Sequence, residues 1–368
     1  MMTLLTIPAG VDEITPEWLT RALRSRGPAN SVSVTSCHSE TVGEGKGFVS
    51  QVARLSVEYD GGGHDEGLPR TMIAKLPSST PEIKALTTLL GDYQRETRFY
   101  EEVASRVAVE TPDCYYSATD PGTGRAILLI EDLSQARLGD SVAGCSIAEA
   151  RLVVGLLAGL QAPWWNAAAL DRLDWMPLKT ADAGVYQETY SQAWSMLAQK
   201  AGGGMPDHLA GIAERLEPHI PVIRGRLSDH PRTIVHGDYR LDNLLFGSRD
   251  GRPTVIVFDW EFCTRGRGTY DLATFIAEAF PPEVRREEET GLLRLYHSAL
   301  IENGVRGYSY EQCLLDYRFS MLDLLLFWIV VGGYCDFGNE RATRYLHNTM
   351  ERFSAAIADH GSVELLSA

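Results

Sequence analysis

The chain has 368 residues, more than one average domain, and 44% of them are apolar, so it can bury a large core in one or two packed lobes. The formal net charge of -15 argues against nonspecific binding to nucleic acid or an anionic membrane. It favours a cationic or neutral small molecule as ligand, although an ordinary acidic surface also accounts for it. The six cysteines form no C-x-x-C pair, which argues against a zinc ribbon or disulfide framework and favours a reducing, cytoplasmic location.

Neither a secretory signal nor a membrane span is expected. Residues 1–15 lack a basic region and a long apolar run. The longest apolar stretch, 324–331, is interrupted by Asp323 and by the pair Gly332-Gly333. It is too short to cross a bilayer, so it predicts a buried core helix.

The first regular elements are predicted to form a long hairpin. From residue 49 to 59 apolar and polar side chains alternate, which indicates a half-buried strand. The Gly-rich run 60–67 is a turn, and 70–76 is the returning strand, with Lys75 near its end.

A long helix is expected beyond Pro81. Its apolar face carries a carboxylate, Glu96, among residues spaced three or four apart, which are Leu86, Leu89, Tyr93, Tyr100 and Val103. A buried carboxylate costs several kcal/mol unless a cation or donors satisfy it. Lys75 is the expected partner of Glu96.

Two further strands are expected over 112–116 and 126–130. Near Asp132 the strand patterns end and the sequence pattern changes. We therefore expect an N-terminal lobe of residues 1–132 and a C-terminal lobe of residues 133–368. The second lobe is predicted to be mainly helical, apart from a short β-hairpin inside 244–258, with helices over 147–161, 181–200, 207–228, 269–280, 282–302, 310–331 and 340–358.

The segment TIVHGDYRLDNLLF (233–246) and the following TVIVFDWE (254–261) carry the chemistry. Pairing Leu245 with Val257 in the hairpin would set Asn243 across from Asp259, with their Cβ atoms roughly 4.5–7 Å apart. Asp238 lies in the loop that enters the hairpin. Three oxygen-bearing side chains would thus converge, and hard oxygen ligands suit Mg²⁺.

Phosphoryl transfer needs a carboxylate near the attacking hydroxyl, Mg²⁺ on the phosphates, a lysine on the phosphates and a backbone cover. The motif HGDYRLDN resembles the H-G-D-x-x-x-x-N catalytic loop of the aminoglycoside phosphotransferase and choline kinase superfamily. This resemblance implies Asp238 as catalytic base or hydroxyl-orienting carboxylate, and Asn243 and Asp259 as Mg²⁺ ligands. It also implies that Lys75, paired with Glu96, holds the ATP phosphates.

The catalytic-loop histidine, His236, is either a brace for the loop or a proton carrier, and the brace is favoured.

The resemblance extends over most of residues 40–275. It makes 43–50 the loop that covers the phosphates, through Gly45, Gly47, Phe48 and Ser50. It makes Glu131 and Leu133 the hinge that meets adenine through backbone groups. In the tract GTYDLATF, Asp271 is expected to steady the catalytic loop from the following helix.

The resemblance implies an α+β, protein-kinase-like fold of two lobes: a small antiparallel β lobe with one long helix, and a larger, mainly helical lobe. The amino-acid sequence over 42–55, 93–103 and 128–134 is most similar to the ecdysteroid-kinase-like and related bacterial phosphotransferase branch. Eukaryotic protein kinases differ in two places, because Gly237 stands where H-R-D has arginine and Asp259-Trp260 replaces D-F-G. Both differences favour a small-molecule acceptor over a protein.

The expected activity is transfer of the γ-phosphate of ATP, with Mg²⁺, to a hydroxyl of an aminoglycoside, amino sugar, amino alcohol or lipid-like alcohol. The alternatives are a catalytically inactive nucleotide-binding scaffold and a kinase with a protein acceptor. The sequence leaves open the acceptor and the oligomeric state.

Two further groups have open roles. The tryptophans Trp164, Trp165 and Trp175, interleaved with Asp171 and Asp174, form either a wall that stacks on or cages a cation or, as favoured, part of the core. Glu261 and Arg265 either touch substrate or close the loop.

Overall fold

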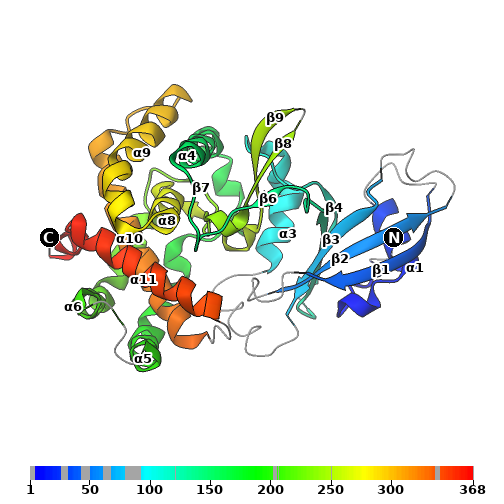
Figure 1. Cartoon of the computed structure of the whole chain (residues 1–368), viewed down its shortest axis with the longest axis horizontal. Helices are drawn as coiled ribbons and strands as arrows, with labels where there is room; N and C mark the ends of the chain where they lie inside the picture. Colours follow the sequence, from blue (N-terminus) through cyan, green and yellow to red (C-terminus); the bar gives the residue numbers. More distant parts are fainter. Residues whose placement is uncertain are drawn as a thin grey trace. The chain divides into compact units, whose positions relative to one another are not determined.

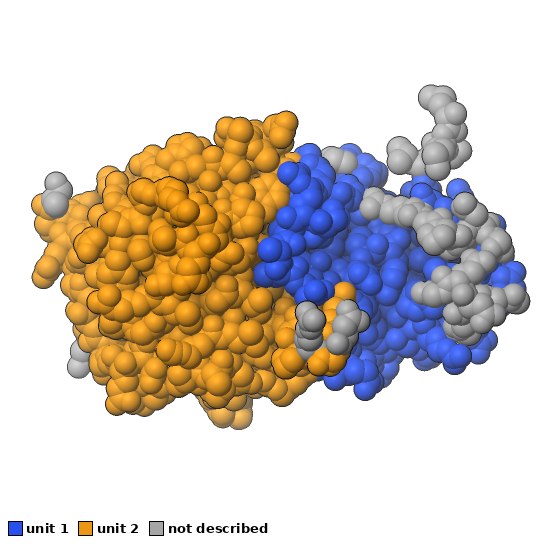
Figure 2. All heavy atoms as spheres, turned by 90° about the horizontal axis from the view of Figure 1, so that it is seen from above, with its two compact units in different colours: residues 1–136 blue, residues 137–368 orange. Residues whose placement is uncertain are grey.

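The computed structural model describes residues 5–25, 32–42, 50–60, 68–78, 93–120, 122–201, 205, 207–249, 251–335 and 340–367. By its internal contacts the chain divides into two compact units, residues 1–136 and 137–368, which Figure 2 colours separately. The boundary follows four residues after the lobe boundary expected from the sequence.

An antiparallel sheet of five strands, in the order β1-β2-β3-β5-β4, forms the centre of unit 1 (Figure 1). Its strands are β1 (Val34–Thr41), β2 (Ser50–Tyr59), β3 (Thr71–Pro77), β4 (Cys114–Asp120) and β5 (Arg125–Glu131). The alternation expected in the first hairpin is confirmed, because Ala53, Leu55 and Val57 of β2 are buried between more exposed neighbours. These side chains point into the core because successive residues of a strand face opposite sides.

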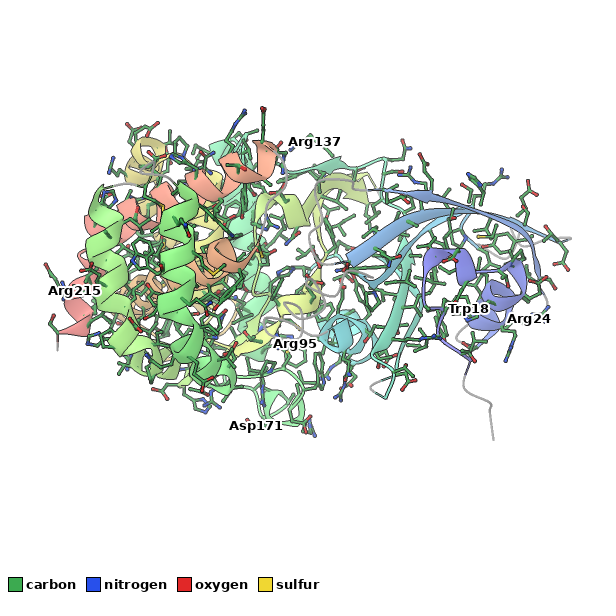
Figure 3. All side chains as sticks on the ribbon, turned by 90° about the horizontal axis from the view of Figure 1, so that it is seen from below. Trp18, Arg24, Arg95, Arg137, Asp171 and Arg215 are labelled. Atoms are coloured by element: carbon green, nitrogen blue, oxygen red, sulfur yellow. The ribbon has the colours of Figure 1, made fainter. Side chains whose placement is uncertain are left out.

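Helix α1 (Pro16–Arg24), which the sequence analysis missed, covers one face of this sheet. Leu19, Ala22 and Leu23 pack in a buried cluster with side chains of the sheet. Trp18 and Arg24 of this helix are labelled in Figure 3. Its start could have been recognised, because Thr15 caps the Trp18 N–H and Pro16 occupies the first turn.

Strand β1 was also missed. It is almost entirely polar and exposed apart from Val34, so it carries no apolar alternation. It pairs along its length with β2 at the edge of the sheet, and backbone hydrogen bonds place it there. Helix α3 (Tyr93–Glu102) packs on β4 and β5. The earlier turns of the helix that was expected from Pro81 onward lie outside the described residues.

Unit 2 is mainly helical, as expected. Its helices are α4 (Ile147–Gln161), α5 (Ala183–Ala201), α6 (Asp207–Leu216), α7 (Ile220–Ser228), α8 (Thr269–Ala279), α9 (Pro282–Glu302), α10 (Tyr310–Tyr334) and α11 (Glu340–Asp359). Helix α10 contains the longest apolar stretch of the sequence and is buried over most of its length, where it packs against α5, α8 and α11. Among the described residues, no helix is long and apolar enough to cross a membrane.

One helix prediction was wrong in extent. The single helix expected over 207–228 is two helices, α6 and α7, separated by a 3-10 turn at Glu217–His219. The cause is local: Pro218 and Pro221 lack the N–H that a continuous helix would need.

The hairpin that carries the proposed metal ligands has a register one residue away from the predicted one. Strands β8 (Leu244–Arg249) and β9 (Arg252–Val257) pair Leu244, and not Leu245, with Val257. The reason is the turn: Arg249 pairs with Arg252, which leaves two residues between the strands, a common length for a β-hairpin loop. Asn243 therefore lies opposite Phe258, and the Phe258 N–H donates to the Asn243 carbonyl at 3.2 Å.

Short strands lie around the catalytic loop, which connects β7 (Thr233–Val235) to β8. Strand β7 pairs with β10 (Thr264–Gly266) in a separate two-stranded sheet, and β6 (Arg137–Leu138) adds a third strand beside β8. The catalytic loop begins directly after β7 and ends at β8.

Candidate active site

Lys75 of β3 and Glu96 of α3 form the ion pair that the sequence predicted. The Lys75 Nζ lies 2.7 Å from a Glu96 carboxylate oxygen, and the two side chains are only 12% and 4% exposed. Lys75 projects from a strand paired on both sides, with β2 and β5, so its backbone is held firmly. Glu96 shares the buried side of α3 with Phe99 and Tyr100.

The predicted hinge begins at Glu131, the last residue of β5. The Glu131 N–H is already used inside the unit, because it donates to the Asp113 carbonyl at 2.8 Å. The Leu133 carbonyl accepts from the Ala136 N–H, whereas the Leu133 N–H has no partner among the described residues. Of the two predicted hinge residues, Leu133 is thus the one whose backbone donor is available to a ligand.

The segment 43–50, which is predicted to cover the phosphates, falls mostly outside the described residues, including Gly45, Gly47 and Phe48. Ser50, the last residue of that segment, begins β2 opposite Pro77. Its hydroxyl is buried and has no hydrogen-bond partner in the part of the chain that the structure describes.

Gly237 allows the catalytic loop to turn sharply after β7. Its φ of 88° is in the left-handed region, and a Cβ at this position would lie 2.1 Å from the Phe262 carbonyl oxygen. Both conditions require glycine. The residue that stands where protein kinases have arginine is therefore fixed by the close approach of two backbone segments.

Asp271, in the first turn of α8, anchors this loop as expected. Its carboxylate accepts hydrogen bonds from the His236 and Gly237 N–H groups, at 2.8 and 2.9 Å, and from the Gln161 side chain at 3.1 Å. Burial raises the pKa of Asp271 to about 7, although the two backbone donors oppose that shift.

His236 has the contacts of a brace. Its Nε2 donates to the Phe258 carbonyl at 3.0 Å, and its Nδ1 accepts from the Asp238 N–H at 3.2 Å. This pattern fits a neutral ring, and burial lowers the pKa of His236 below its ordinary value. Its ring also packs against Trp260, with the centroids 4.5 Å apart. His236 thus ties the catalytic loop to the strand end that carries Asp259.

The structure brings Asp238 and Asn243 together. The Asn243 amide donates to an Asp238 carboxylate oxygen, Oδ2, at 2.7 Å and to the Asp238 carbonyl at 2.9 Å. The same Oδ2 accepts from Arg240 Nε at 2.9 Å. The other oxygen, Oδ1, accepts no hydrogen bond from the described residues. One oxygen is held in place while the second is available to a ligand.

Arg240 is a site residue that the sequence analysis missed. Its guanidinium contacts Asp238 and Asp242 and lies over the Tyr345 ring at 5.0 Å. Burial alone would lower the pKa of Arg240, but Asp238, Tyr345, Glu278 and Asp242 together outweigh burial and raise the pKa well above its usual value. The available signal was an arginine inside the motif HGDYRLDN, where a buried cation next to a carboxylate fixes that carboxylate's geometry.

Asp259 follows β9 and adopts a left-handed conformation, with φ 65° and ψ 64°. Aspartate tolerates this region better than most residues, and such strain is commonly found at functional sites. A carboxylate oxygen of Glu261 lies within 4.8 Å of one of Asp259, and Glu261 is buried. Glu261, whose role was open, therefore adds a second carboxylate beside the proposed metal ligand.

The donor set fits Mg²⁺. Because the Asn243 amide nitrogen faces Asp238, its carbonyl oxygen Oδ1 is the atom left for a cation, and it has no partner among the described residues. Together with the Asp259 and Glu261 carboxylates, it gives an all-oxygen set, as a hard divalent ion requires.

Arg265 closes a loop. Its guanidinium donates to the Met176 and Leu170 carbonyls, at 2.7 and 2.9 Å.

Of the tryptophans, Trp164 is buried, which agrees with core packing, whereas Trp165 packs on Tyr308 with the ring centroids 4.8 Å apart. Asp171 is exposed on the turn nearby (Figure 3).

Comparison with known families gives one match over most of the chain. The model of the ecdysteroid kinase-like family matches residues 44–306. Two curated relatives, acyl-CoA dehydrogenase family member 11 from Pongo abelii and from Homo sapiens, are 40% identical to this chain over 97 residues. That stretch is 26% of this chain and only 12% of each relative, so it covers a small part of those longer proteins.

Several solved structures share the fold. LicA in complex with AMP has a TM-score of 0.52 at 17% identity, over 93% of this chain and 98% of that chain. An ethanolamine kinase from Plasmodium vivax has a TM-score of 0.52 at 13% identity, over 87% and 82%. A protein of Ralstonia eutropha JMP134 described as an aminoglycoside phosphotransferase has 0.51 at 19%, over 93% and 97%. These likenesses confirm the predicted α+β, kinase-like fold.

Proposed function

The chain belongs to the ecdysteroid kinase-like family, and we propose that it is an active small-molecule kinase that transfers the γ-phosphate of ATP to an alcohol. The fold and the family support a kinase-like phosphotransferase. ATP as donor, Mg²⁺ as cofactor and the acceptor hydroxyl are the parts that this proposal adds.

The observation that carries the proposal is the state of the Asp238 carboxylate. One oxygen is fixed by Arg240 and Asn243, and the other has no partner among the described residues. A carboxylate held in this way can accept the proton of a substrate hydroxyl as its oxygen attacks the γ-phosphorus. In that step the new O–P bond forms, the bond to the β-phosphate oxygen breaks, and ADP leaves.

The remaining roles follow from charge and geometry. Asn243 and Asp259 would hold Mg²⁺, with Glu261 beside Asp259. When bound, the ion would neutralise part of the negative charge of the phosphates. Lys75, oriented by Glu96, would hold the nonreacting phosphates, and the Leu133 N–H would donate to the adenine. His236 keeps the loop in shape and moves no proton.

A catalytically inactive scaffold is the competing function. It would retain nucleotide binding without needing an oriented carboxylate, so the arrangement of Asp238, Arg240 and Asn243 favours the enzyme. The acceptor is left as an alcohol of the amino sugar, aminoglycoside, amino alcohol or lipid class, and relatives of this fold named for ethanolamine and aminoglycosides make amino alcohols and aminoglycosides the first ones to test.

The test is ADP release by the purified chain with Mg²⁺ and ATP across a panel of these alcohols. We expect one class to stimulate turnover, and Asp238→Asn to lower kcat by roughly 10²–10⁴, the usual contribution of a positioned acid–base group, with little change in ATP affinity. Asp259→Ala should also weaken binding of Mg-ATP, because it removes a metal ligand.

The matched control is Glu214→Gln, which makes the same change of charge at an exposed position of α6. It should turn over at the wild-type rate. Equal rates for Asp238→Asn and the wild type would contradict the site assignment. Tight Mg-ATP binding with no turnover on any alcohol would favour the scaffold.

A further inference from the structure

A cavity of about 390 Å³ opens in unit 2 away from the catalytic loop. Its lining includes His230, which precedes β7, and Arg267, which follows β10. Because Gly266 pairs with Thr233, these residues meet at the start of β7, whereas the catalytic loop leaves its other end. The strand between them spans about 10 Å at 3.3 Å per residue. The cavity is therefore separate from the Asp238 site.

The lining of this cavity is cationic in an acidic protein. It contains Arg226, Arg267 and Arg306 and no carboxylate, although the whole chain has a formal charge of -15. Asp316, which is buried and is not among the lining residues, pairs with Arg267 at 2.8 Å and compensates one of the three charges.

The other two guanidinium groups have no ion-pair partner among the described residues. Arg306 donates to the backbone carbonyls of Ile301 and Val305, at 3.0 Å each. Arg226 lies over the Phe319 ring at 5.8 Å, and its Nε is buried with no hydrogen-bond partner in the described part of the chain. A buried donor without a partner is unfavourable and is rarely retained without a reason.

Electrostatics gives the same indication. Burial lowers the pKa of Arg267 below its ordinary value; Asp316, Tyr308 and Asp229 oppose this effect, and the neighbouring Arg226 adds to it. Two guanidinium groups therefore repel each other in a partly buried place. A bound anion would relieve this repulsion and satisfy the orphan donor.

Aromatic rings stand beside these cations. Trp165 and Tyr308 both line the cavity, and their ring centroids lie 4.8 Å apart. The alternative in which Trp165 cages a cation does not fit a wall that holds three arginines. A flat apolar surface next to guanidinium groups suits an anion that carries an organic group.

We propose that this cavity binds a small phosphorylated metabolite, with its phosphate held by Arg226, Arg267 and Arg306 and its organic part packed on Trp165 and Tyr308. The planar fork of arginine matches the tetrahedral oxygens of phosphate, and the volume falls at the small end of ligand sites. This binding site is additional to the proposed kinase site and does not depend on its activity.

The experiment is calorimetric titration of the full chain, without ATP or Mg²⁺, with phenyl phosphate, inorganic phosphate and phenol. We expect phenyl phosphate to bind more tightly than inorganic phosphate, and phenol not to bind. Arg226→Gln and Arg306→Gln should each weaken phenyl phosphate binding about tenfold or more, since each removes a charge-assisted hydrogen bond.

The control variant is Arg215→Gln on α6, labelled in Figure 3, whose side chain likewise donates to a backbone carbonyl, that of Val363, outside the cavity. It should bind phenyl phosphate as the wild type does. A melting temperature of Arg226→Gln equal to that of the wild type would show that its weaker binding does not reflect unfolding. Unchanged affinity in both cavity variants would overturn the proposal. Equal affinity for inorganic and phenyl phosphate would overturn the role of the aromatic rings.

Discussion

At the scale of single residues, the catalytic loop depends on a backbone contact. Gly237 combines a left-handed conformation with an approach to the Phe262 carbonyl that leaves no room for a side chain. The contact brings the loop of Asp238 against the segment that follows Asp259. Neighbouring contacts, from His236 to Phe258 and from Asp271 to the loop amides, hold the same two segments together.

We therefore expect Gly237→Ala to destabilise the protein by on the order of 3 kcal/mol or more, because it adds both steric overlap and backbone strain. Gly291 in α9 is the matched control, since a Cβ there meets nothing within 4 Å and the residue is exposed. Gly291→Ala should be neutral or stabilise by about 0.5–1 kcal/mol. Urea unfolding followed by circular dichroism measures both, and equal midpoints would contradict this account of the loop.

At the scale of elements, helix α8 connects the catalytic loop to the core. Every residue of α8 is buried, and it carries two buried carboxyl groups, Asp271 and Glu278, seven residues apart and so on one face. Asp271 binds the loop amides, while Glu278 accepts from the Tyr345 hydroxyl at 2.6 Å. Burial raises the pKa of each to about 7, and for Glu278 the Arg240 charge opposes this shift while Asp238 adds to it.

The raised pKa of Glu278 predicts a pH dependence of stability. Between its ordinary value of 4.5 and about 7, the folded chain holds a proton that the unfolded chain has released, so the free energy of unfolding falls as pH rises. Relative to Glu278→Gln, which cannot titrate, the wild type should lose on the order of 3 kcal/mol across this range.

Urea unfolding of both proteins at pH 4.5, 5.5, 6.5 and 7.5 checks this expectation. The comparison with the glutamine variant removes the contribution of all other titrating groups. Parallel curves for the two proteins would show that folding does not raise the pKa of Glu278.

At the scale of the whole molecule, the charge of -15 sets a negative field around the protein. Such a field attracts cationic ligands over a distance that salt shortens, to about 10 Å at 0.1 M ionic strength. The cationic cavity is a local exception to this field.

If the acceptor is a cationic amino alcohol, its kcat/KM at saturating Mg-ATP should fall severalfold as salt rises from low to physiological ionic strength. A neutral alcohol accepted by the same site is the control, and its kcat/KM should change little. Steady-state assays at several salt concentrations measure both. An identical salt response for the two acceptors would exclude steering by the net charge.

Much of the fold could be predicted from the sequence, because periodicity is a local property. The helices 147–161 and 282–302 have the expected bounds, and strand β2 appears where apolar and polar residues alternate. Strand β1 was missed because it is polar and is held by pairing with β2. The helix over 207–228 was read as continuous because its apolar spacing continues through the two prolines.

The sequence by itself determined which residue types are present for phosphoryl transfer, since the motif HGDYRLDN and the Asp259 that follows it lie in one short segment of the chain. It also identified Lys75 as the partner of Glu96, because a buried carboxylate requires a cation. Only the tertiary structure decided the hairpin register, the place of Arg240 beside Asp238, and the gathering of Arg226, Arg267 and Arg306 around one cavity. These features join residues that lie on different elements or depend on a turn's length. Their proximity follows from packing and hydrogen bonding, which no local pattern of side chains encodes.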